Sequence, residues 1–128
     1  MQSTILLVDD EPNVLYALVR GLRHQPYRIF TATSAEEAMV AMKSQSVDLL
    51  VTDEQMTGMP GTRLLAWVAE HFPDVVRIVL TGHPSVDLML SAVNEGRVFR
   101  VFTKPCNDMD LALAIREGLD SRLAAEVA

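Results

Sequence analysis

Five residues of types used in phosphoryl chemistry stand at four separate places in the sequence. Asp9, Asp10 and Asp53 supply carboxylates, while Thr81 supplies a hydroxyl group and Lys104 an ammonium group. A carboxylate can attack phosphorus and form an aspartyl phosphate, and the other two groups can stabilise charge on a transferred phosphoryl group. Taken singly, an aspartate after a strand is more often a helix cap or a turn residue. The phosphoryl chemistry therefore requires a fold that brings all five residues together.

The hydrophobic pattern predicts such a fold. Short apolar runs typical of strands alternate with longer runs of helical periodicity along the chain. The predicted strands are 5–8, 28–32, 47–51, 75–80 and 98–102. The apolar faces of the predicted helices are centred on 14–22, 35–42, 64–72, 86–93 and 111–119. This α/β order indicates a parallel sheet covered by helices on both faces. An open doubly wound sheet suits the length, since an eight-stranded barrel needs about 200 residues or more.

Local signals mark the ends of several of these helices. Pro12 suits the first turn of the first helix. Ser34 and Glu37 have the spacing of a capping box at the start of the second. Pro73 stops the third helix, and Asn107 can cap the last one. The connections between strands and helices are therefore short.

All five candidate residues lie where a predicted strand ends. Asp9 and Asp10 follow the first strand and Asp53 the third, while Thr81 and Lys104 follow the fourth and fifth. The carboxyl ends of parallel strands share one edge of the sheet, and functional sites collect there. Carboxylates that lie close together repel each other, and Lys104 offsets only part of this charge. Mg²⁺ suits a site of one or two carboxylates completed by water and phosphate oxygens. The sequence therefore predicts a magnesium-dependent aspartyl-phosphate site.

Composition bounds the class of protein. The 128 residues fit one domain with a substantial core. We predict a single domain over 1–128, with a helical tail from about residue 121 that suits the start of a linker to an output domain. The net charge of −6 and the scattering of the 11 basic residues argue against direct nucleic-acid binding. No apolar run could span a bilayer, and the single Cys106 agrees with a reducing compartment. We therefore expect a cytoplasmic domain without membrane contacts.

The set of strand-end residues resembles that of the receiver domains of two-component response regulators, over essentially the whole chain. This resemblance implies a flavodoxin/CheY-like sheet of five strands in the order 2-1-3-4-5. It implies that Asp53 is the phosphoacceptor and that Lys104 and Thr81 contact the phosphoryl group. It also implies that Mg²⁺ is held by Asp9, Asp10, Asp53 and the backbone carbonyl of Gln55. Such a domain promotes its own phosphorylation and dephosphorylation but is a signalling domain rather than an enzyme.

The resemblance also implies partners. The phosphoryl group would come from a histidine kinase, and an output domain or a downstream protein would respond. We expect phosphorylation to switch the surface of the fourth helix, fifth strand and fifth helix, with Leu88, Met89 and Val101 as candidate contacts and dimerisation through this surface. Gln55 and His83 match two variable positions that influence how quickly the phosphate is lost.

The sequence departs from the common receiver pattern at three positions. Thr57 stands where the family usually has proline, and Gly82 where alanine or serine is frequent. Val101 stands at the usual aromatic switch position, so the aromatic residue to which the family's switch hydroxyl is usually coupled is missing there. The segments 80–84, 94–96 and 99–100 resemble receivers attached to HD-type phosphodiesterases or hydrogenase-type transcription regulators.

Three alternative functions compete with this one. A flavodoxin-like nucleotide binder needs a phosphate-cradling turn after the first strand, where Asp9 and Asp10 would repel phosphate. A phosphatase of the haloacid dehalogenase type needs an Asp-x-Asp pattern there, which Asp9-Asp10-Glu11 lacks. A degenerate receiver that serves only as a constitutive interaction module remains as the third alternative.

Overall fold

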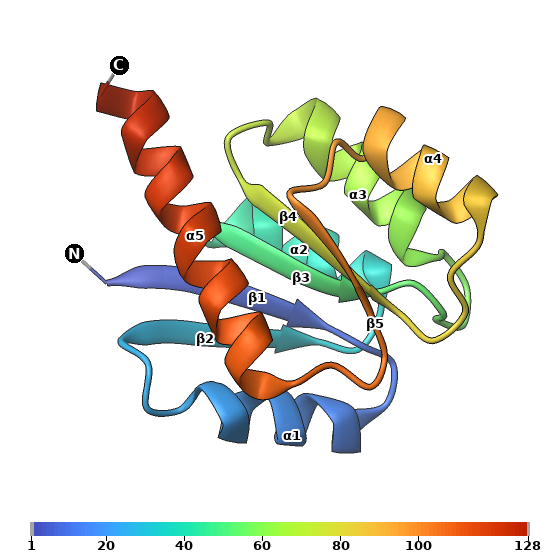
Figure 1. The fold of residues 1–128 in the computed structure, drawn as a ribbon, viewed down its shortest axis with the longest axis horizontal. Coiled ribbons are helices and arrows are strands. Elements are labelled where there is room, and N and C mark those ends of the chain that lie inside the picture. The colour runs from blue at the N-terminus through green and yellow to red at the C-terminus, as the bar shows by residue number, and fades with distance from the viewer. Residues whose placement is uncertain (1, 128) are drawn as a thin grey trace.

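A five-stranded parallel sheet lies between two layers of helices in the computed structural model (Figure 1). The structure describes residues 2–127, with side chains described through residue 124. The strands are β1 (Ser3–Val8), β2 (Tyr27–Ala32), β3 (Leu49–Asp53), β4 (Val76–Thr81) and β5 (Arg100–Thr103). The helices are α1 (Pro12–Leu22), α2 (Ala35–Ser44), α3 (Gly61–His71), α4 (Val86–Asn94) and α5 (Asp108–Val127). The strand order β2-β1-β3-β4-β5 confirms the predicted doubly wound fold.

The sheet has a hydrophobic core on each of its faces. One core joins Leu6 and Leu50 of the central strands to Leu64 of α3, and helices α2 and α4 pack against the same face. The other joins Leu7 and Val51 to residues of α1 and α5. Neighbouring residues of one strand therefore face opposite cores, as period-two alternation requires. Burial on both faces explains why the central strands are continuous apolar runs.

The helix signals of the sequence are confirmed with one refinement. Pro12 occupies the first turn of α1. The Ser34 hydroxyl accepts a hydrogen bond from the Glu37 backbone N–H at 3.0 Å, while the Glu37 carboxylate accepts one from Thr33 N–H instead of that of Ser34. The Asn107 side chain accepts a hydrogen bond from Met109 N–H at 2.7 Å at the start of α5. No helix within residues 2–127 is long and apolar enough to cross a membrane.

All five strands differ from their predicted bounds by one or two residues, and the shifts of β3 and β5 and the exposure of one helical face need explanation. Strand β3 runs to Asp53, which pairs with Leu80, so the strand carries this residue directly. Strand β5 begins only at Arg100, because Val98 N–H still bonds to Ala92 O of α4. The apolar face of α4 is exposed instead of contributing to the core. Its exposed members are Val86, Met89, Leu90 and Val93.

Gly61 offers a test of how tightly the fold holds the end of β3. A methyl group at this position would overlap the backbone carbonyl of Asp53, and backbone atoms cannot yield as a flexible side chain can. We expect Gly61→Ala to lower the free energy of unfolding by about 2 kcal/mol or more. Gly82→Ala is the control, because its added methyl group meets no atom within 4 Å. Equal stability of the two variants in urea denaturation would contradict this packing.

Candidate functional site

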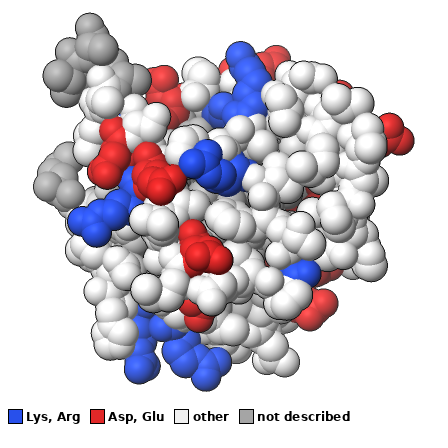
Figure 2. All heavy atoms as spheres, viewed as in Figure 1, with Lys and Arg blue, Asp and Glu red and all other residues white. Residues whose placement is uncertain are grey.

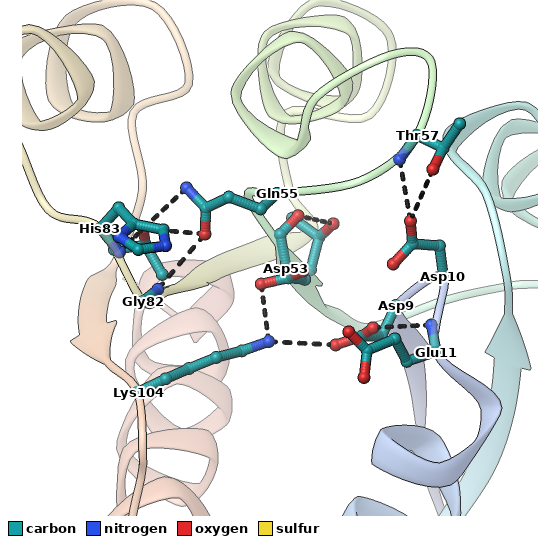
Figure 3. Close-up of polar contacts among 11 residues, drawn as sticks. Asp9, Asp10, Glu11, Asp53, Gln55, Thr57, Gly82, His83 and Lys104 are labelled. Carbon is teal, nitrogen blue, oxygen red and sulfur yellow. Dashed lines mark hydrogen bonds and ion pairs between the residues drawn. The ribbon is translucent and has the colours of Figure 1, made fainter.

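The ends of four strands bring the candidate residues together at one edge of the sheet (Figure 3). Asp9 follows β1, Asp53 is the last residue of β3, Thr81 is the last of β4, and Lys104 follows β5. The backbone N–H of Lys104 donates to the carbonyl of Thr81 at 2.7 Å, which fixes the loop after β5 against the end of β4. The Lys104–Pro105 peptide bond is cis. Every strand-end residue singled out in the sequence therefore lies at this edge.

Lys104 is the cation of the site and contacts two buried carboxylates. Its Nζ lies 2.8 Å from Asp53 Oδ1 and 3.3 Å from Asp9 Oδ2. Asp53 is only 4% exposed and Asp9 only 1% exposed. The other oxygen of Asp9 accepts a hydrogen bond from Glu11 N–H at 2.9 Å. The ammonium group therefore bridges the acidic residues after β1 and β3.

Burial and charge shift the pKa values of this pair. Burial raises the pKa of Asp53 above the ordinary aspartate value, Lys104 opposes that rise, and Asp9 and Asp10 add to it. Burial alone would lower the pKa of Lys104, but its contacts with Asp53 and Asp9 outweigh burial and hold that pKa above the usual lysine value. The site thus holds carboxylates whose charges are incompletely compensated.

Three carboxylates at this edge have the arrangement that a metal ion needs. One ligand oxygen from each of Asp9, Asp10 and Asp53 lies within 4.8 Å of the others. Their three negative charges face the single positive charge of Lys104, which leaves an excess of about two in the ionised state. An all-oxygen donor set with this excess charge fits a hard divalent cation such as Mg²⁺. The residues present therefore fit the ion that the sequence predicts.

Asp10 is held by a contact that the sequence analysis missed. Its Oδ2 accepts hydrogen bonds from both the backbone N–H of Thr57, at 2.8 Å, and the Thr57 hydroxyl, at 3.2 Å. A proline at position 57, usual in receiver domains, could donate neither bond. The sequence showed that Thr57 replaces the usual proline, but it did not show that Thr57 contacts Asp10, which lies 47 residues away in the chain. Thr57 therefore orients one predicted metal ligand.

The loop after β3 is anchored by Glu54, which no sequence motif marks. Its carboxylate accepts hydrogen bonds from the backbone N–H of Thr62, at 2.6 Å, and from the Thr62 hydroxyl, at 3.1 Å. The N–H of Glu54 donates to Leu80 O of β4 at 2.9 Å. These bonds fix the start of α3 relative to Asp53.

Thr81 is fully buried, and its hydroxyl bonds to the side chain of Gln55. The backbone N–H of His83 also donates to this hydroxyl, at 3.1 Å. The resemblance gave Gln55 a backbone carbonyl that binds the metal and an influence on how quickly the phosphate is lost, and both assignments stay predictions. The contact between the Gln55 side chain and Thr81 is new.

Comparison with known proteins identifies the family of this chain. The family model of the response regulator receiver domain matches residues 5–116, which is most of the chain. This chain belongs to the response regulator receiver family. In this family a phosphoacceptor role and an acidic pocket that binds Mg²⁺ are general. Receiver domains are signalling domains and not enzymes in the ordinary sense.

Solved structures share the fold of this receiver domain. The signal receiver domain of an HD domain-containing protein from Pseudomonas fluorescens Pf-5 is 35% identical, with a TM-score of 0.94 over 97% of this chain and 99% of that one. A CheY-like receiver from Methanospirillum hungatei is 27% identical, again with a TM-score of 0.94, over 98% of this chain and 99% of that one.

Curated relatives are transcription regulators of much greater length. The hydrogenase transcriptional regulatory protein HoxA of Cupriavidus necator is 32% identical over 94% of this receiver and 25% of its own length. NtrC of Salmonella typhimurium is 31% identical over 91% of this receiver and 24% of its own length. The chain thus spans about a quarter of the length of these relatives. Of the two classes that segments 80–84, 94–96 and 99–100 resemble, a hydrogenase-type transcription regulator occurs among the similar proteins, as does the receiver of an HD domain-containing protein.

The raised pKa of Asp53 predicts that replacing this residue by a neutral one stabilises the folded protein, and that the gain in stability depends on pH. The folded protein keeps the Asp53 proton at pH values where the unfolded chain has lost it, so ionisation costs stability as pH rises through this window. We expect Asp53→Asn to raise the thermal midpoint by a few degrees at neutral pH in EDTA. The gain in stability should vanish below the ordinary aspartate pKa, where the side chain at position 53 is neutral in both the wild type and the variant.

Asp74 provides a matched control because it is exposed on the loop before β4. Asp74→Asn should leave the midpoint nearly unchanged at both pH values. A gain for Asp53→Asn that is equally large in acid would show that its source is packing and not charge.

Proposed function

We propose that Asp53 accepts a phosphoryl group from a histidine kinase in a magnesium-dependent reaction, and that the domain passes this signal to an output domain or partner protein. The observation that carries the proposal is the contact of one ammonium group with buried carboxylates after β1 and β3, at the edge where Thr81 ends β4. Such a set places donors for phosphoryl oxygens beside a carboxylate that can act as the nucleophile.

The transfer is a displacement at phosphorus. Asp53 Oδ1 is fully buried and contacts Lys104, which leaves Oδ2 as the attacking oxygen. A P–O bond forms to Asp53 while the P–N bond of the kinase phosphohistidine breaks, and the imidazole takes the electron pair. Mg²⁺ held by Asp9, Asp10, Asp53 and the Gln55 carbonyl would supply charge neutralisation for the phosphoryl oxygens. Water later cleaves the acyl phosphate and regenerates the carboxylate and inorganic phosphate.

Lys104 and Thr81 act on the phosphoryl group after its transfer. Lys104 already lies beside Asp53, so its ammonium group can pair with a phosphoryl oxygen without a large movement. The hydroxyl of Thr81, at the end of the neighbouring strand β4, can donate a hydrogen bond to another phosphoryl oxygen. Movement of Thr81 is the first step in switching the surface of α4, β5 and α5.

The exposed face of α4 supports this surface as the one that partners read. Val86, Met89, Leu90 and Val93 follow helical spacing and are all more than 40% exposed. Leu88 and Val101, predicted as contacts, are only partly exposed, so Met89 alone of the three belongs to the exposed face. An apolar stripe of this kind suits a homodimer or an output domain.

The charge distribution supports protein partners in preference to nucleic acid. Basic and acidic side chains are intermixed on the face shown in Figure 2, without a continuous basic stripe. The net charge of −6 points the same way. We propose that any DNA contact of the whole protein belongs to another domain, to which α5 leads as the start of a linker.

Intact mass after incubation with acetyl phosphate and Mg²⁺ tests the proposed function. We expect one added phosphoryl group, absent in Asp53→Asn and absent when EDTA removes the metal. Asp48→Asn is the control, because Asp48 pairs with Arg122 far from the site and its loss should not prevent modification. No adduct on the wild-type protein would overturn the proposal and favour the constitutive interaction module.

A further inference from the structure

The side-chain carboxamide of Gln55 lies against the end of β4, where it meets one side-chain donor and one backbone donor (Figure 3). Its Oε1 accepts a hydrogen bond from the Thr81 hydroxyl at 3.2 Å and another from the Gly82 backbone N–H at 3.3 Å. Its Nε2 lies 3.1 Å from the same Thr81 oxygen. One side chain therefore engages both the hydroxyl group of the last residue of β4 and the backbone N–H of the residue after it.

The orientation of this carboxamide is fixed by chemistry. A backbone N–H can only donate, so the group that faces Gly82 must be the oxygen of Gln55 and not its nitrogen. The Thr81 oxygen accepts a hydrogen bond from His83 N–H, and its single proton is directed to Gln55 Oε1. Both donors, the Thr81 O–H and the Gly82 N–H, are therefore committed to one neutral oxygen.

A phosphoryl oxygen on Asp53 would compete for the same donors, because Asp53 pairs with Leu80 and the two donors belong to the residues that follow Leu80 in the chain. Each donor carries one proton, so neither can serve Gln55 Oε1 and a phosphoryl oxygen fully at the same time. An anionic oxygen is the stronger acceptor, and it would displace the carboxamide. The Gln55 side chain is exposed, so its amide can transfer to water without being left unsatisfied.

We infer that Gln55 Oε1 takes the place of a phosphoryl oxygen in the unphosphorylated protein and competes with the phosphoryl group for Thr81 and Gly82. This inference rests on the proposed function, since it gives Gln55 control over the same site. Gln55 is a positioning residue: it holds the Thr81 hydroxyl until a stronger acceptor arrives, and thereby raises the free energy needed to reach the switched state.

Two substitutions at position 55 should act in opposite directions. Gln55→Leu keeps the approximate size but removes the acceptor, and it leaves the backbone carbonyl in place. Gln55→Glu keeps an acceptor, strengthens it, and adds a charge that repels the incoming anion. The probe is beryllofluoride, which mimics a phosphoryl group, titrated at saturating Mg²⁺ and followed by NMR. Gln45→Leu, at the exposed end of α2, is the matched control.

We expect Gln55→Leu to bind beryllofluoride about five- to tenfold more tightly than the wild type, the effect of releasing one or two competing hydrogen bonds. Gln55→Glu should bind it more weakly, and Gln45→Leu should match the wild type. Without any probe, the amide proton signal of Gly82 should move in Gln55→Leu, because it loses its acceptor. A purely structural role of Gln55 would not give opposite changes for the two variants.

The experiment distinguishes failure of the inference about Gln55 from failure of the proposed function. An unmoved Gly82 signal, or equal or weaker beryllofluoride binding by Gln55→Leu, would overturn the inference about Gln55 and leave the proposed function intact. Failure of the wild type and of every variant to bind beryllofluoride would overturn the proposed function, and this inference would fall with it. Tight binding by Gln55→Leu alone would support Gln55 as a strong competitor.

Discussion

The ion pair between Lys104 and the buried Asp53 is the contact on which the rest of the site depends. Three carboxylates lie close together at one edge of the sheet, and Lys104 is the cation that contacts two of them. Removing carboxylates from water is costly unless a cation compensates them. The excess negative charge that remains makes the edge suitable for a divalent cation, and with such a cation it can receive a phosphoryl group.

The fold sustains this charge because the apolar strands behind it are rigidly packed. Every residue of β3 is buried, so the backbone that carries Asp53 is held from both faces of the sheet. Glu54 and Thr57 then fix the loop beyond the strand and the carboxylate of Asp10. Thr81, in contrast, is held by the exposed and replaceable side chain of Gln55. The site thus combines fixed carboxylates with one hydroxyl group that can change partner.

The sequence could predict the sheet and the edge where the site lies, because both follow from hydrophobic periodicity and from the geometry of parallel strands. It could not predict that Thr57 meets Asp10 or that Gln55 meets Thr81. These contacts join loops far apart in the chain and depend on side-chain rotamers. The apolar face of α4 was visible as a pattern, but periodicity does not tell whether such a face meets the core or solvent. The shifted start of β5 arose from hydrogen bonds at the end of α4, which have no sequence signal.

Reductive mapping of the acyl phosphate tests the central claim most directly. Borohydride converts an aspartyl phosphate to homoserine, and fragment masses of the digested protein then identify the residue that carried the phosphoryl group. We expect homoserine at position 53 alone after treatment with acetyl phosphate and Mg²⁺. Homoserine at position 9 or 10, or a phosphoryl group that resists reduction on another residue such as His83, would contradict it.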